Sequence, residues 1–122
     1  MGGGMQPSFD DKNLRGFVLA KIRQAGAGVG FALGSAALAD RAMQLFNRDI
    51  STREIRQAVH DLRAEGQPIC SSGAGFFWPC CLQDVMQTVE LEFRSVARSE
   101  LLTARLLRDS GRRLFGGQWR LL

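Results

Sequence analysis

Apolar residues recur at intervals of three and four positions in four stretches of the chain, the spacing of amphipathic helices. The first stretch covers about residues 10–24, and the second begins at Ser35, which we expect to cap its helix. Four glycines between positions 26 and 34 predict a break with a short extended piece. The third stretch ends near Glu65, because Gly66 and then a proline follow it. The fourth begins at Leu82.

The start of the third helix carries the strongest local signal. Ser51-Thr52-Arg53-Glu54 has the S-x-x-E form of a capping box, in which the serine side chain and the glutamate side chain each bond the other residue's amide. Ile50 before this box and Ile55 after it have the spacing of a hydrophobic staple. Both devices predict a helix that begins at Ser51.

A change of period follows the third helix. Two short β-prone runs between Pro68 and Trp78 flank the sequence Ser72-Gly73-Ala74-Gly75, which predicts a β-hairpin. Aromatic residues that follow its turn can stack on unpaired bases, but at alternating strand positions some must face the interior. We therefore expect Phe77 or its neighbours to pack in the core.

The fourth stretch contains no proline or glycine between Leu82 and Ser110, which predicts one long helix over residues 82–110. Its apolar stripe exceeds what three short helices and a hairpin are expected to cover, and association with a second copy would bury it. The residues expected at this homodimer interface are Leu82, Met86, Val89, Phe93 and Leu101. The alternative is that the helix folds back over the first helix of its own chain.

The elements together predict a mainly α fold with a small β-hairpin. We expect a flexible N-terminal tail over residues 1–9, one domain over 10–81, the dimerisation helix over 82–110, and a basic and aromatic tail over 111–122. With 122 residues, the chain is long enough for one domain with a single core.

The segment from Ile50 to Trp78 resembles the winged helix-turn-helix domains of the biotin-repressor-like class, found in bacterial and phage proteins. The features that carry this resemblance are Leu62-Arg63, Gly66, Pro68-Ile69 and Gly75-Phe76. The resemblance implies a winged helix-turn-helix followed by the long helix. It further implies a duplex DNA-binding protein, either a small transcriptional regulator or a phage-type accessory protein that acts as a dimer.

The charge of the chain favours an anionic partner. Lys and Arg number 16 against 12 Asp and Glu, and the arginine fork suits phosphates and guanine edges. The residues expected to contact DNA lie on the outer face of the third helix, in the turn before it and at the hairpin: Arg48, Ser51, Thr52, Arg53, Arg56, Gln57, His60, Arg63, Ser71, Ser72 and Gly73. Alternatively, these arginines only form a solvated face. In that case the domain is a protein-interaction module, such as an inhibitor or assembly factor, that does not read DNA.

Catalysis and metal binding find little support in the sequence. His60 is the single histidine, so pairs of catalytic or metal-binding histidines are excluded. Cys80 and Cys81 are adjacent and lack the gap of a zinc knuckle, so we expect no metal site and no cofactor. No apolar run reaches the ~18 residues of a membrane span. The odd number of cysteines and the absence of a signal-like start favour the cytoplasm.

Overall fold

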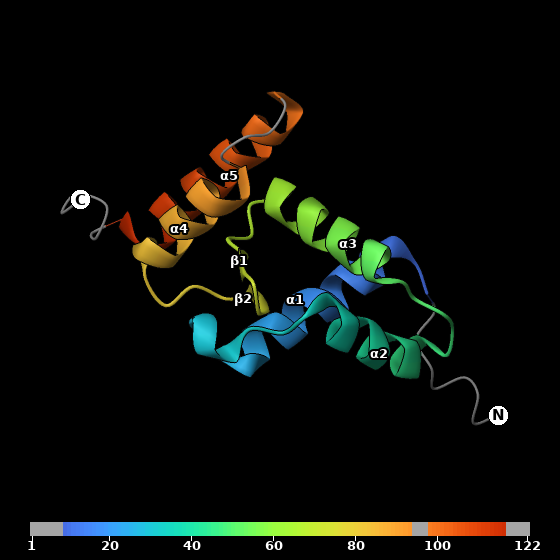
Figure 1. Ribbon diagram of the computed structural model, residues 1–122. Helices are drawn as coiled ribbons and strands as arrows, with labels where there is room; N and C mark the ends of the chain where they lie inside the picture. Colours follow the sequence, from blue (N-terminus) through green and yellow to red (C-terminus); the bar gives the residue numbers. More distant parts are fainter. Residues whose placement is uncertain (1–8, 94–97, 117–122) are drawn as a thin grey trace.

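The computed structural model describes residues 9–93 and 98–116, without the side chains of 92–101, and it is mainly helical with one small antiparallel sheet (Figure 1). The elements in chain order are α1 (Asp11–Ala25), the 3-10 helix η2 (Val29–Phe31), α2 (Ser35–Phe46), α3 (Thr52–Ala64), β1 (Cys70–Ser72), β2 (Gly75–Phe77), α4 (Leu82–Phe93) and α5 (Arg98–Leu114). None of the helices in the described ranges combines the length and apolar content that a membrane crossing requires. The expected tail residues 1–8 and 117–122 lie outside the described part.

Helices α1, α2 and α3 enclose the first of two hydrophobic cores. Their apolar faces supply its fully buried side chains, which are Val18, Ile22, Leu38, Ala42 and Ile55. Asp10 caps α1 by accepting a hydrogen bond from the Asn13 amide at 2.7 Å. Phe46, at the end of α2, makes edge-on ring contacts with Phe9 and Phe17. The three predicted helices are confirmed.

The predicted start of α3 is confirmed as well. Ser51 is the N-cap, and its hydroxyl accepts a hydrogen bond from the Glu54 amide at 3.1 Å. The Glu54 carboxylate turns toward Arg48, with 3.5 Å between the charged groups, in place of the reciprocal bond of a full capping box. Ile50 and Ile55 are both buried in the first core, as a hydrophobic staple requires. The predicted cap of α2 is wrong by one residue, because Gly34 occupies the N-cap position and Ser35 begins the helix.

The predicted hairpin is confirmed, with Cys70 opposite Phe77 and Ser72 opposite Gly75. The segment before α2 lies along the other edge of β2, where the amide of Leu33 donates to the Phe76 carbonyl at 2.8 Å and Phe76 returns the bond at 2.9 Å. Gly75 makes this approach feasible. A Cβ atom there would lie 2.3 Å from the Leu33 carbonyl oxygen, and the φ of Gly75 is +130°.

The outer edge of β1 is occupied by a side chain of α4. The Ser71 amide donates to the Thr88 hydroxyl at 3.1 Å, and that hydroxyl contacts the Ser71 carbonyl at 3.4 Å. The same hydroxyl lies 3.0 Å from the Asp84 carbonyl. Thr88 is buried, and its hydroxyl bonds backbone groups of both β1 and α4, so it joins the strand to the helix.

The prediction of one helix over residues 82–110 is wrong. The segment forms α4 and α5, which lie side by side and pack against each other (Figure 1). Helix α5 continues to Leu114, so the first residues of the expected C-terminal tail are helical. Gly111 faces α4 closely, since a Cβ atom added there would lie 2.7 Å from Cγ1 of Val85.

This helical pair forms a second core against the hairpin. Its buried members are Cys70, Phe77, Leu82, Val85, Ala104 and Leu107. Leu82 is fully buried here, and Met86 and Val89 pack at the edge of the cluster. The expectation that Leu82 is left for a second copy is therefore wrong, because its own chain buries it, whereas Met86 and Val89 are only partly covered and their place in a homodimer interface stays a prediction. The side chains of Phe93 and Leu101 lie outside the described part.

Candidate nucleic-acid interface

A groove of about 270 Å³ lies where the start of α2, the middle of α3 and the β1–β2 turn meet. Its lining includes Gly34, Ser35, Arg56, Ser71, Ser72 and Gly73. Four of these six residues, those on α3 and the hairpin, are among the predicted DNA contacts. The fold thus places Arg56 of α3 beside the hairpin residues, up to 17 positions later in the chain, and it adds the start of α2 to them.

The local structure explains how each side chain reaches the groove. Ile55, Val59 and Leu62 seat α3 on the first core, which leaves Arg56 exposed beside the hairpin. The Ser72 hydroxyl accepts from the Ala74 amide at 3.1 Å, which shapes the turn. The Leu33–Phe76 pairing holds the start of α2 against this turn.

The start of α2 was not among the predicted contacts. Gly34 has no side chain with which to cap the helix, and no side-chain cap bond is present there. The first amides of a helix carry partial positive charge and bind anions readily. A glycine directly before a serine- and alanine-rich helix was the available signal. Its position beside the hairpin depends on tertiary pairing that the sequence pattern does not show.

Two arginines of α3 have free guanidinium groups within the described structure. Arg53 and Arg56 are exposed and make no hydrogen bond or ion pair with another described residue. The acids of α3, in contrast, have partners on the side that faces α1. Glu65, the C-cap of α3, pairs with Arg15 at 2.9 Å, and Asp61 accepts from the side-chain Nε2 of Gln57 at 2.9 Å. The acids therefore do not neutralise the two arginines directly.

The expectation that Arg63 projects outward is wrong, because only 3% of this residue is exposed. Its Nε donates to the carbonyl of Ile69 at 2.8 Å, and a second guanidinium nitrogen donates to the Ser71 hydroxyl at 3.3 Å. Residue 63 follows the core residue Leu62 and lies one helical turn beyond Val59, which turns it toward the hairpin. Arg63 therefore lies in the interior, where it holds Ser71, a residue that lines the groove.

The remaining predicted contacts do not line the groove. Ser51 and Thr52 are the cap and the first residue of α3. Arg48 lies over the Phe9 ring, 3.9 Å from its centroid, and pairs with Glu54. The His60 ring faces α5, with Nε2 at 3.3 Å from the Thr103 hydroxyl. Helix α5 thus flanks the second half of α3, and the first half, with Arg53 and Arg56, is the more accessible part.

No protein-family model, no curated protein and no solved structure matches this chain. The candidate interface therefore depends on the chemistry and placement of its own residues.

Proposed function

We propose that this protein binds duplex DNA through the first half of α3, with the groove beside the hairpin holding a backbone phosphate. The observation that carries the proposal is the convergence of Arg56, Ser71, Ser72 and the start of α2 on one groove. Guanidinium groups, hydroxyls and helix N-termini are the groups that bind DNA phosphates in known complexes.

Arg53 supplies the second part of the proposed contact. It is exposed near the start of α3, on the face opposite the buried residues. The major groove of B-form DNA is wide enough for an α-helix, and an arginine in it can bond both O6 and N7 of guanine. With a phosphate held in the groove at Arg56, α3 would enter the major groove by its N-terminal half.

The fold proposed for residues 10–81 is a winged helix-turn-helix, with β1 and β2 as the wing. The order of helix, extended segment, two helices and hairpin supports this assignment, as does the pairing of Leu33 with β2. The resemblance of residues 50–78 points the same way. We extend the proposal to a small regulatory or phage-type accessory protein, which is the role that the resemblance implies.

The test is a titration of fluorescently labelled duplex DNA, with binding followed by anisotropy at several salt concentrations. The parent protein is expected to bind with an affinity that falls steeply with salt, because phosphate contacts release counterions. Arg56→Ala is expected to reduce the slope of log K against log salt by about 0.9, the contribution of one phosphate. Arg53→Ala is expected to cost about 1–3 kcal/mol at a preferred site and less at bulk DNA.

Arg105→Ala is the matched control, since it removes the same charge from an exposed position on α5. An equal loss of affinity in this variant would indicate nonspecific attraction to the net charge of +4. Salt-independent or undetectable binding of duplex DNA by the parent protein would contradict the proposal.

A protein-interaction role is the second candidate. Leu91 and Leu102, on α4 and α5, are 74% and 57% exposed. Exposed leucines of this kind occur in protein contacts as well as singly on ordinary surfaces. Under this role, Leu91→Ser would abolish binding of a partner protein, and Arg53→Ala would not alter it.

A further inference from the structure

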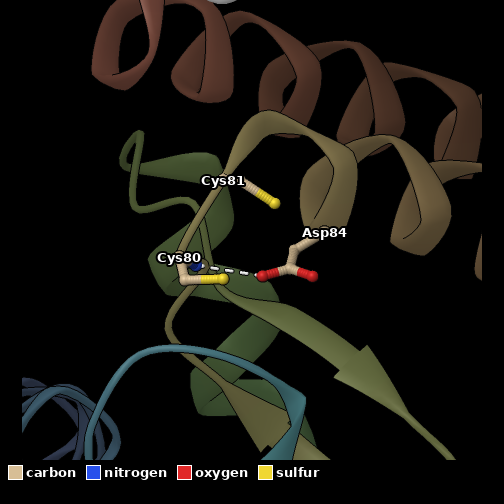
Figure 2. Close-up of side chains that lie close together, drawn as sticks. All are labelled: Cys80, Cys81 and Asp84. Carbon is tan, nitrogen blue, oxygen red and sulfur yellow. Dashed lines mark hydrogen bonds between the residues drawn. The ribbon is translucent and has the colours of Figure 1, made fainter.

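Two thiols and a carboxylate converge in the segment that joins the hairpin to α4 (Figure 2). Cys80 and Cys81 precede the helix, and Asp84 lies in its first turn. The two Sγ atoms and a carboxylate oxygen of Asp84 all lie within 4.8 Å of one another. This cluster is distinct from the DNA interface proposed above.

Backbone hydrogen bonds hold the three residues in this arrangement. The Cys80 amide donates to Oδ2 of Asp84 at 3.0 Å, which folds the loop back onto the helix. The Asp84 amide donates to the Cys81 carbonyl at 3.2 Å. Because the loop is tied to the first turn of α4 at both cysteines, the ligand atoms approach one another before any ion is bound.

We propose that Cys80, Cys81 and Asp84 form a binding site for a thiophilic divalent cation, Zn²⁺ being the one we expect. Zinc binds thiolates at about 2.3 Å and carboxylate oxygens at about 2.0–2.2 Å in tetrahedral geometry. Two sulfurs on one tetrahedral zinc are then about 3.8 Å apart. From separations of up to 4.8 Å, the two sulfurs have to approach by at most about 1.0 Å, and each sulfur and the carboxylate oxygen by at most about 1.2 Å, to reach this geometry.

The type and number of ligands define the chemistry of the site. Two thiolates favour zinc over hard cations such as Mg²⁺, which prefer oxygen ligands. Within the described residues the cluster contains three candidate ligands, so the fourth position is left for water or an external ligand. Cys80 is exposed and the other two residues are partly exposed, so the ion can enter from solvent.

His60 and Cys70 are the histidine and the third cysteine of the chain, the other residues that could complete a zinc site of the knuckle type. The structure gives those two residues other surroundings. Cys70 is buried in the second core, and the His60 ring lies beside Thr103. Asp84, three positions beyond Cys81, provides the third ligand that adjacent cysteines lack. Adjacent cysteines in a bent loop that folds back onto a helix can thus serve where a knuckle is absent.

The test is a Zn²⁺ titration of the reduced, metal-free protein in competition with a chromophoric chelator. We expect one zinc per chain, unaffected by excess Mg²⁺. Replacement of a ligand should weaken binding by more than about 100-fold for Cys80→Ser and Cys81→Ser, since even second-shell changes cost 10–100-fold. Asp84→Asn keeps an oxygen that can accept from the Cys80 amide but loses the charge, and it is expected to weaken binding at least about 10-fold.

Cys70→Ser is the control, because it removes one thiol and leaves the cluster intact. It should bind zinc like the parent protein. Co²⁺ provides an independent readout, since thiolate ligation gives a charge-transfer absorption that both cluster cysteine variants should lose. Circular dichroism checks the fold, and the exposed position of Cys80 makes Cys80→Ser the variant least prone to unfold. Equal zinc binding by the Cys80→Ser/Cys81→Ser double variant and the parent would overturn the proposal, as would absence of stoichiometric binding by the parent.

Discussion

Arg53, Arg56 and Arg63 follow one another along α3, and their surroundings separate them into two kinds. The guanidinium groups of Arg53 and Arg56 are exposed, whereas that of Arg63 is buried against the start of β1. A sequence pattern assigns all three to the outer face, because a residue at the border of the buried face belongs to either side. Only the contacts of the neighbouring hairpin decide the environment of Arg63.

Arg63→Leu tests this difference. The replacement leaves the buried Ile69 carbonyl without its 2.8 Å donor, and an unsatisfied buried acceptor costs about 1–3 kcal/mol. The free energy of unfolding measured in urea should fall by that amount. Arg56→Leu, on the exposed side, should change it by less than about 0.5 kcal/mol. Equal effects of the two variants would contradict the assignment.

Ser51→Ala removes the side-chain cap of α3. Loss of the 3.1 Å bond to the Glu54 amide should lower the free energy of unfolding by about 1 kcal/mol. Ser51→Asp, which retains an acceptor and suits the positive helix start, should preserve stability. Thermal denaturation of the three proteins compares them directly, and an unchanged Ser51→Ala variant would mean that solvent replaces the cap at no cost.

The buried thiol of Cys70, in the second core, makes the stability of the protein depend on pH. Burial, the largest cause, raises the pKa of its thiol from 9.0 to about 12. The folded protein therefore keeps the proton between these pH values, while the unfolded chain loses it. Stability should be fully present below pH 9.0 and should decline as the pH rises toward 12. Urea unfolding across this range checks the decline, and Cys70→Ala should make it shallower; an identical decline in the variant would assign it to other groups.

At the scale of elements, local signals gave reliable predictions and long-range ones did not. The cap at Ser51 and the turn after Ser72 depend on neighbours in the sequence, and both are confirmed. The apolar stripe after Leu82 is also real, but its period continues without a break that marks the end of α4. Whether a stripe meets its own chain or a second copy depends on how α4 and α5 pack, which periodicity does not encode.

Gly111 is the residue through which the packing of α4 and α5 is most directly tested. Gly111→Ala places a Cβ atom 2.7 Å from the buried Val85, and overpacking of this kind costs about 1–3 kcal/mol. Gly16→Ala is the control, because nothing lies within 4 Å of its added Cβ atom and alanine favours a helix by about 1 kcal/mol. Urea denaturation should show opposite signs for the two variants, and stabilisation by both would mean that α5 does not approach α4 so closely.

At the scale of the whole molecule, the β-hairpin joins two cores. Ile69 lies in the first core, and the adjacent Cys70 lies in the second. The candidate groove forms on the hairpin because Leu33, far away in sequence, pairs with Phe76. Arg56, Ser71 and Ser72 could be predicted from their residue types, whereas Gly34 and Ser35 could not, because their place at the groove depends on that pairing.

The closure of α5 over α4 also sets an expectation for the oligomeric state. Leu82 is buried by its own chain, so the apolar stripe no longer supplies a reason for association. Sedimentation at micromolar concentration should give the mass of one chain. A concentration-dependent dimer would instead point to other apolar surface, and Leu91→Ser and Leu102→Ser, which remove exposed leucines, would then dissociate it.

The contacts along the two edges of the hairpin bear on aggregation. A strand with unpaired amides and carbonyls is a template on which another chain can add a strand, and short hairpins are vulnerable to this. Here the backbone of Leu33 occupies the edge of β2, and the Thr88 hydroxyl occupies the backbone groups of Ser71 on β1. A helix side chain and a glycine-rich loop thus occupy these backbone groups, and we expect them to hinder edge-to-edge strand addition as long as α4 stays docked.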